Sequence, residues 1–146
     1  MSNNLEMLNQ LYDTVLNLDN VYSKWAKKYN ITKNELCTLN VLLKNKDKDI
    51  TQKQISESIG ITFTTLNSVM KNLCSKKYIV FNVNQKNHKE KYLALTEKGI
   101  AYAESIVNPL MDIEQKTADK LKSEDILNAI KCLEDYKDSL LEFITK

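Results

Sequence analysis

The chain has 146 residues, of which 42% are hydrophobic and 27% are charged, values typical of a folded protein with one hydrophobic core. No apolar run approaches the roughly 20 residues that span a bilayer. The N-terminus lacks the basic start and apolar centre of a signal peptide, so we expect a cytoplasmic protein.

The net charge of +2 hides an uneven distribution along the chain. Residues 71–98 contain seven lysines and two acids, whereas residues 112–146 contain nine acids and six lysines. All 21 basic residues are lysines. Because arginine is the usual bidentate partner of guanine, its absence predicts little direct readout of guanine.

Motifs that carry enzyme chemistry are missing from the sequence. It has one histidine, His88, and no glycine-rich phosphate loop, H-E-x-x-H or nucleophile elbow. The cysteines (Cys37, Cys74 and Cys132) lack metal-binding spacing, and we expect them to be small half-buried apolar residues. We therefore expect no enzyme activity, no catalytic residue, no metal site and no cofactor.

Helices are predicted for most of the chain, which contains only two glycines and one proline. Residues 5–29 carry apolar side chains at three- and four-residue steps, which predicts an amphipathic helix. Thr32 and Glu35 have the spacing of a capping box at the start of a second helix, which runs to about Lys44. A very short strand is expected at Ile50.

A helix-turn-helix is predicted next. Thr51 and Gln54 repeat the capping-box spacing at the start of a short helix. This helix is expected to end at Gly60, because glycine readily adopts the left-handed conformation found after helices. Thr62 is expected to cap a further helix that runs to about Lys76.

This further helix is predicted to have two unlike faces. One face gathers Leu66, Val69, Met70 and Leu73, and we expect Phe63 to belong to the core beside them. The other face gathers Thr64, Asn67, Ser68, Lys71 and Ser75. A merely solvated helix usually carries pairs of opposite charge, but no acid lies between Glu57 and Glu90. The pattern therefore favours a face that reads a DNA groove over a plain surface helix.

A β-hairpin wing is predicted after this helix. Residues 78–83 and 92–95 are rich in strand formers and flank the polar segment 84–91. The tip carries Lys86, His88, Lys89 and Lys91. Because Glu90 is the only acid nearby, the composition favours a tip that faces phosphates over a solvated loop.

The C-terminal part is predicted to form two helices. The first contains Pro109, which should kink it near Asn108, and the second is expected to be capped by Ser123. These helices and residues 5–29 carry more apolar side chains than a small winged helix needs to close its core. A C2 homodimer is therefore expected.

Four segments make the sequence resemble the MarR-type winged-helix transcriptional regulators over nearly the whole chain. They are residues 50–55 (ITQKQI), 73–79 (LCSKKYI) and 95–99 (LTEKG), and Pro109 followed by residues 121–125 (LKSED). The resemblance implies a mainly α fold with a small β-wing, formed as one domain by residues 1–146. Its winged helix-turn-helix lobe would be residues 32–96, and its long dimerisation helices would lie in residues 1–31 and 97–146.

The chain departs from the family pattern at the wing. Family members often have glycine before the first wing strand, where this chain has Lys77. They commonly have an Asp–Arg pair that stiffens the wing, where this chain has Asn87 and Lys89. It also lacks the first-helix cysteine through which some members sense peroxides, since residues 1–31 contain none.

The resemblance implies a sequence-specific regulator, usually a repressor, often relieved by a small ligand. We expect a homodimer on a pseudo-palindromic operator, with recognition helices 62–76 in successive major grooves. Hydroxyls and an amide would touch base edges, DNA shape would add specificity, and lysines would contact phosphates. Thr51 and Gln52 would donate to phosphate from a helix N-terminus. The predicted DNA-binding residues are Thr51, Gln52, Thr62, Thr64, Thr65, Asn67, Ser68, Lys71, Lys86, His88, Lys89 and Lys91.

Three alternatives remain open. Tyr22, Trp25 and Tyr29 line a small-ligand pocket or simply belong to the core. One of the cysteines makes the regulator responsive to oxidation, or all three are inert. The third alternative is a winged helix that binds another protein in place of DNA.

Overall fold

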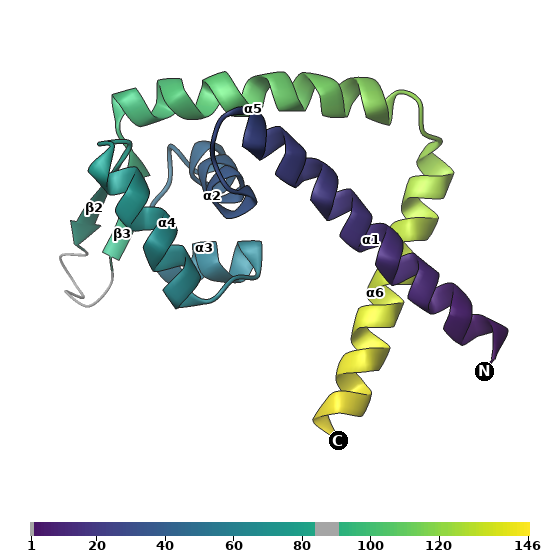
Figure 1. Ribbon diagram of the computed structural model, residues 1–146. Coiled ribbons are helices and arrows are strands. Elements are labelled where there is room, and N and C mark those ends of the chain that lie inside the picture. The colour runs from purple at the N-terminus through teal and green to yellow at the C-terminus, as the bar shows by residue number, and fades with distance from the viewer. Residues whose placement is uncertain (1, 84–90) are drawn as a thin grey trace. The chain divides into compact units, whose positions relative to one another are not determined.

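Residues 2–83 and 91–146 are described by the computed structural model (Figure 1). They form six helices and three short strands. In chain order these are α1 (Asn3–Lys28), α2 (Lys33–Lys44), β1 (Ile50–Thr51), α3 (Gln52–Ile59), α4 (Phe63–Ser75), β2 (Ile79–Val83), β3 (Lys91–Leu95), α5 (Glu97–Ala118) and α6 (Ser123–Thr145). The predicted mainly α fold with a small β-wing is confirmed.

The chain divides into two compact units, Met1–Asn108 and Pro109–Lys146. Helix α5 runs across this boundary and remains helical through Pro109. The boundary between the units therefore falls where the sequence predicts a kink.

Short-range sequence signals set most helix ends. The Thr32 hydroxyl accepts from the Glu35 backbone N–H at 3.1 Å, and the Glu35 carboxylate accepts from the Thr32 N–H at 3.0 Å. This reciprocal pair is the capping box predicted for α2. Gly60 ends α3 with a φ of 76°, in the left-handed region that favours glycine.

One predicted helix cap is wrong. Helix α6 takes Lys122 as its N-cap without a side-chain hydrogen bond, and Ser123 is already helical. The first turn contains Glu124 and Asp125, and negative charge there favours the positive end of the helix dipole. These charges stabilise the helix start without a capping hydroxyl.

The three strands form one antiparallel sheet in the order β1–β3–β2. Leu93 in the central strand lies opposite Ile50 of β1 and Phe81 of β2. Strands β2 and β3 are the predicted wing hairpin. β1 joins this wing to the helix-turn-helix, because α3 begins directly after it.

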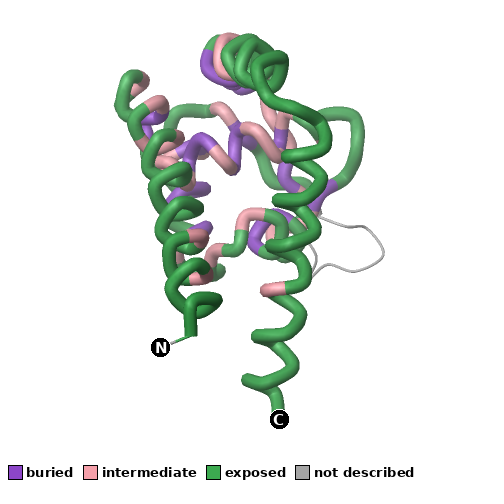
Figure 2. The backbone as a smooth tube through the Cα atoms, turned by 90° about the vertical axis from the view of Figure 1, so that its right-hand side faces the viewer, coloured by how far each residue is buried: buried purple, intermediate pink, exposed green. Residues whose placement is uncertain are grey.

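The core of the first unit is formed by α2, α3, α4 and the sheet, with contributions from α1 and α5 (Figure 2). Its fully buried large side chains are Leu39, Leu42, Ile55, Leu66, Leu73, Leu93, Ile106 and Thr38. The expectation that Phe63 joins this core is wrong, because the ring is exposed. Phe63 is the first residue of α4, and side chains tilt toward a helix N-terminus, so its ring projects past the packed face.

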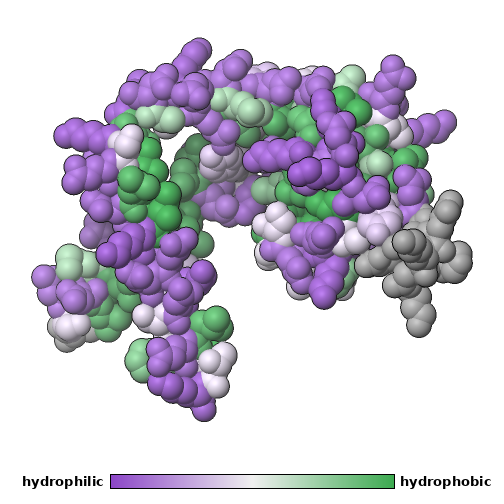
Figure 3. All heavy atoms as spheres, turned by 180° about the vertical axis from the view of Figure 1, so that it is seen from behind, coloured by the Kyte–Doolittle hydropathy of each residue, from purple (hydrophilic) through white to green (hydrophobic). Residues whose placement is uncertain are grey.

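The second unit by itself buries little apolar surface. Helix α6 has no buried residue, and its exposed apolar side chains include Leu127, Ile130, Leu140, Leu141 and Phe143. In the space-filling view of Figure 3, green hydrophobic side chains are visible at the surface among purple hydrophilic ones. Within the described residues, no helix combines the length and apolar character needed to cross a membrane.

Candidate nucleic-acid interface

The two faces of α4 are as different as the sequence predicts. Leu66, Val69, Met70 and Leu73 are buried and attach the helix to the core. Thr64, Asn67, Ser68, Lys71 and Ser75 are exposed. The helix therefore presents small hydrogen-bonding groups and one cation on its outer side.

Some hydroxyls predicted to contact DNA also shape the helix ends. The Thr62 oxygen accepts from the Thr65 backbone N–H at 3.2 Å, which makes it the N-cap of α4, and its hydroxyl lies 3.1 Å from that of Thr65. Thr51 accepts from the Gln54 N–H at 3.2 Å and caps α3. The Ser68 hydroxyl caps no helix and donates to the Thr64 carbonyl at 3.4 Å, which is long for such a bond. Thr51 and Thr62 therefore have structural tasks whether or not DNA is bound.

An amide pair joins the two helices of the helix-turn-helix. The side-chain N–H of Gln52, the first residue of α3, donates to the side-chain oxygen of Asn67 in the middle of α4. The sequence places both residues among the DNA-binding candidates but does not show that they are partners. They are 15 positions apart, and only the packing of α3 on α4 brings them together.

Of the predicted cationic contacts, Lys71 and Lys91 lie within the described residues. Lys71 is exposed on the outer face of α4. Lys91 begins β3, and its ammonium nitrogen lies 5.9 Å from the Phe81 ring centroid, within cation–π range. Lys86, His88 and Lys89 lie outside the described residues.

A buried carboxylate fixes the inner side of α4. Glu35 is 7% exposed, and besides closing the cap of α2 it accepts a hydrogen bond from the side-chain amide of Asn72. Sequence reasoning assigns Glu35 to the capping box alone and does not single out Asn72. The sequence signal that could have identified Asn72 is a polar residue next to the buried face of α4.

Hydrogen bonds join the turn that follows α4 to residues at the start of α5. Lys77 adopts a φ of 61°, the left-handed conformation for which family members often use glycine. The Thr96 hydroxyl donates to the Lys77 carbonyl at 2.7 Å, and the Lys98 ammonium donates to the Lys76 carbonyl at 3.1 Å. These bonds hold the turn between α4 and the wing against α5.

Three aromatic residues lie near the C-terminal end of α1. Tyr22, Trp25 and Tyr29 are half-buried, and the Trp25 and Tyr29 centroids are 5.4 Å apart. The Trp25 indole N–H donates to the Ile106 carbonyl of α5 at 3.2 Å. Trp25 therefore has a clear packing task in the first unit.

Burial disfavours the reactive thiolate form of Cys37 and Cys74. Burial raises the pKa of Cys37, an effect that Lys33 partly offsets and Asp19 increases, and burial also raises the pKa of Cys74. Both are half-buried, as predicted, but Cys132 is exposed, so that part of the expectation is wrong. Cys132 lies on α6, a helix in which no residue is buried. Across residues 2–83 and 91–146, no group of three or more His, Cys, Asp or Glu residues could hold a metal ion.

Comparison with known proteins identifies both a matching family and a shared fold. The model of the family described as transcriptional regulator SarA/Rot matches residues 20–106, which is more than half of the chain. No curated protein sequence matches the chain.

Solved structures of MarR-type regulators have the same fold. A MarR family regulator from Neisseria meningitidis is 22% identical, with 95% of this chain and 96% of that chain covered and a TM-score of 0.81. MepR of Staphylococcus aureus in its DNA-binding conformation is 22% identical, with coverage of 91% and 98% and a TM-score of 0.76. MarR from Oenococcus oeni is 22% identical, with coverage of 90% and 98% and a TM-score of 0.72. The fold predicted from the MarR resemblance is therefore confirmed.

Proposed function

The chain belongs to the SarA/Rot family of transcriptional regulators, and we propose that it is a homodimeric repressor that binds a pseudo-palindromic DNA operator through α4. The observation that carries this proposal is the outer face of α4. It presents hydroxyls, an amide and a lysine, with no acid in the helix. A protruding helix with such a face can enter a major groove, where amides and hydroxyls pair with base edges.

The lysines supply the affinity in this proposal. Lys71 on α4 and Lys91 on the wing would contact phosphates, together with Lys86, His88 and Lys89. A MepR–DNA complex, 22% identical with a TM-score of 0.75, supports DNA binding by a protein of this fold. Thr64, Thr65, Asn67 and Ser68 would meet base edges, and Thr51, Gln52 and Thr62 would lie at the rim.

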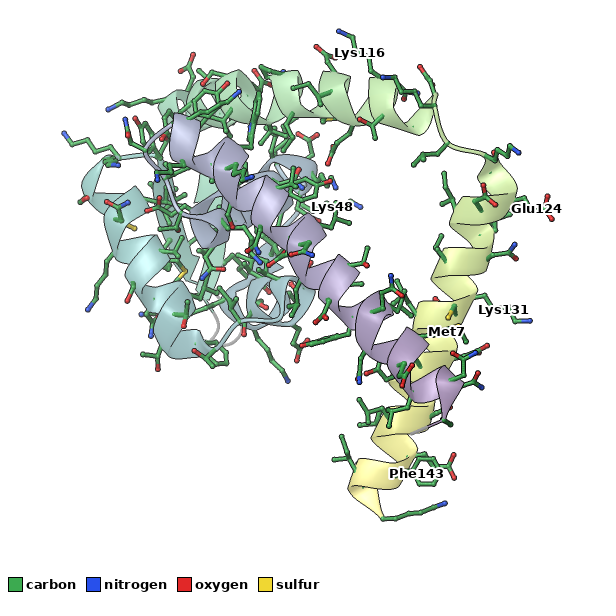
Figure 4. All side chains as sticks on the ribbon, turned by 45° about the vertical axis from the view of Figure 1, so that its right-hand side comes forward. Met7, Lys48, Lys116, Glu124, Lys131 and Phe143 are labelled. Carbon is green, nitrogen blue, oxygen red and sulfur yellow. The ribbon has the colours of Figure 1, made fainter. Side chains whose placement is uncertain are left out.

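Solvent-exposed apolar side chains support the proposed homodimer. Met7 on α1 and Phe143 on α6, labelled in Figure 4, are 52% and 74% exposed. Exposed apolar side chains recur along α1 and through the second unit. Association of two copies would remove this surface from water and place two α4 helices on one DNA duplex. Residues 1–31 and 97–146 would then be the dimerisation helices, and 32–96 the DNA-binding lobe.

Tyr22, Trp25 and Tyr29 are the proposed location for a small-molecule effector that relieves repression. Their rings are half-buried near the C-terminal end of α1, where the Trp25 indole donates to the Ile106 carbonyl of α5. A ligand bound among these rings would act on the contact between α1 and α5.

DNA binding is tested by selecting bound duplexes from a random pool and measuring the selected site by gel shift. We expect an inverted-repeat site. Lys71→Ala should weaken binding to all sequences and lower the slope of log affinity against log salt by about one. Lys137→Ala, an equal charge change on α6, should leave that slope unchanged. Failure of the wild-type protein to enrich any sequence would contradict the proposal.

The wing is tested in the same assay with Lys86→Ala combined with Lys89→Ala. We expect a uniform loss of affinity and a salt slope lower by about one per lost phosphate contact. An unchanged slope would remove the wing from the interface while leaving α4 in place.

The homodimer is tested by sedimentation. The wild-type protein should sediment with the mass of two chains. Leu140→Glu should shift it toward one chain, because it puts a charge into the proposed interface. Ser139→Glu places the same charge on the neighbouring exposed residue and should shift the equilibrium less.

A further inference from the structure

We infer that Gln52 sets the base specificity of Asn67, and that the two amides act as one unit that selects adenine at one position of each half-site. The inference rests on the proposed DNA-binding function and makes it more specific. Its starting point is the hydrogen bond from the Gln52 side-chain nitrogen to the Asn67 side-chain oxygen.

Asn67 is the exposed residue of α4 best suited to bidentate base recognition. The other outward polar groups are the hydroxyls of Thr64, Ser68 and Ser75 and the ammonium of Lys71. Hydroxyls pair with several bases, whereas an asparagine amide matches adenine, because its N–H donates to N7 and its oxygen accepts from N6. The second asparagine of the helix, Asn72, is occupied by Glu35.

An asparagine reads adenine only if its amide faces the base in the correct sense. The terminal torsion of asparagine has a broad, roughly two-fold preference, so nitrogen and oxygen exchange places easily. In the structure the Gln52 nitrogen bonds the Asn67 oxygen and leaves the Asn67 nitrogen on the other side, and we infer that this sense of the pair is the one that meets the base. The oxygen has a second lone pair, so it can still accept from adenine N6.

The helices that carry the two amides are both packed into the core. Ile55 of α3 and Leu66 of α4 are fully buried. The Ser56 hydroxyl donates to the Ile61 carbonyl at 2.6 Å across the turn between these helices. Gln52 is not needed for the cap of α3, which uses Thr51 and Gln54. Its amide is therefore available to orient Asn67 before DNA arrives, which lowers the ordering cost of binding.

The test uses the duplex that the wild-type protein selects from a random pool. Each base pair of its half-site is changed in turn, and affinities are measured by gel shift for the wild type, Asn67→Ala, Gln52→Ala and the double variant. The wild type should prefer adenine at one position by about ten- to a hundredfold. Asn67→Ala should abolish this preference. Gln52→Ala should reduce it at that position alone, and the double variant should match Asn67→Ala.

Two further measurements separate orientation from other roles. Replacing the adenine with 7-deazaadenine, which lacks the N7 acceptor, should weaken the wild type but not Asn67→Ala. Gln52→Glu can only accept from Asn67, so it should turn the amide round and reject adenine at that position. The added charge also lowers affinity for every sequence, but this uniform loss cancels in the ratio between base pairs. Ser58→Ala, an exposed change on α3, should leave all ratios unchanged.

The inference fails if Gln52→Ala weakens all sequences equally, since Gln52 would then be a phosphate contact. It also fails if Gln52→Ala alters preference at a base pair that Asn67→Ala does not affect, or if the preferred base at the Asn67 position is not adenine. These outcomes differ from failure of the proposed function, in which the wild-type protein selects no sequence.

Discussion

The indole N–H of Trp25 donates to the backbone carbonyl of Ile106 at 3.2 Å, across 81 positions of sequence. This bond joins α1 to the part of α5 just before the boundary between the two units. Ile106 is fully buried and Trp25 is half-buried, so the bond lies at the edge of the core. A carbonyl oxygen has two lone pairs, so Ile106 can accept from Trp25 in addition to its helical partner.

Trp25→Phe keeps an aromatic ring but removes this donor. We expect the free energy of unfolding to fall by about 0.5–1.5 kcal/mol, the net contribution of one hydrogen bond. Urea denaturation followed by circular dichroism measures this change at fixed protein concentration, because association would shift the midpoint. Tyr12→Phe, a change on an exposed ring of the same helix, is the control. Equal midpoints for Trp25→Phe and the wild type would contradict the expectation.

Glu35 and Asn72 should be energetically coupled. Asn72→Ala leaves one oxygen of the Glu35 carboxylate without its donor, and Glu35→Ala leaves the Asn72 amide without its acceptor and also opens the cap of α2. Each single change should cost about 1–3 kcal/mol. The double change should cost less than the two single costs together, with a coupling of about 0.5–3 kcal/mol. Urea denaturation of the four proteins completes the cycle. Single costs that simply add would show that the bond does not hold α4 to α2.

The two glycines should respond very differently to alanine. A Cβ at Gly99 would lie 1.9 Å from the Tyr78 carbonyl oxygen, so backbone would have to move. A Cβ at Gly60 meets nothing within 4 Å, but its φ of 76° costs an ordinary residue about 1–2 kcal/mol. We expect Gly99→Ala to destabilise more than Gly60→Ala by about 2 kcal/mol or more. Thermal unfolding of both variants compares them, and a smaller effect at Gly99 would contradict the predicted clash.

Tyr102 should make stability fall at high pH. Burial, and then the nearby Tyr78 and Glu35, raise the pKa of its phenol above the usual value of about 10. A group whose pKa is raised on folding stabilises fully below its unfolded pKa, and this stabilisation is lost as pH rises through the folded pKa. Urea midpoints at about pH 8 and about pH 11 should therefore differ less for Tyr102→Phe than for the wild type. An identical difference in the two proteins would rule out this role.

Cys37 and Cys74 should react slowly with iodoacetamide in the folded protein. The thiolate is the reactive form, and burial raises the pKa of both thiols. Mass spectrometry should show slower alkylation of both in buffer than in urea, with exposed Cys132 least protected. If mild peroxide oxidises Cys37 or Cys74 and changes DNA affinity, the thiol-responsive alternative replaces this expectation.

Much of the fold follows from short-range signals in the sequence. The capping boxes at Thr32 and Thr51 and the left-handed Gly60 depend on residues only a few positions apart. The spacing of Leu66, Val69, Met70 and Leu73 likewise identifies the buried face of α4. Phe63 and Ser123 were predicted wrongly because a local pattern does not show where packing stops or which residue begins a helix.

The sequence by itself determined which residues of α4 face outward and which are buried. Only the tertiary structure decided how those residues are held. It pairs Gln52 with Asn67, Glu35 with Asn72, Trp25 with Ile106 and Gly99 with the Tyr78 carbonyl. These partners are 15 to 81 positions apart, and their contacts depend on how separate elements pack. No periodicity along the chain encodes such a distance, because the same helical faces could meet in several registers.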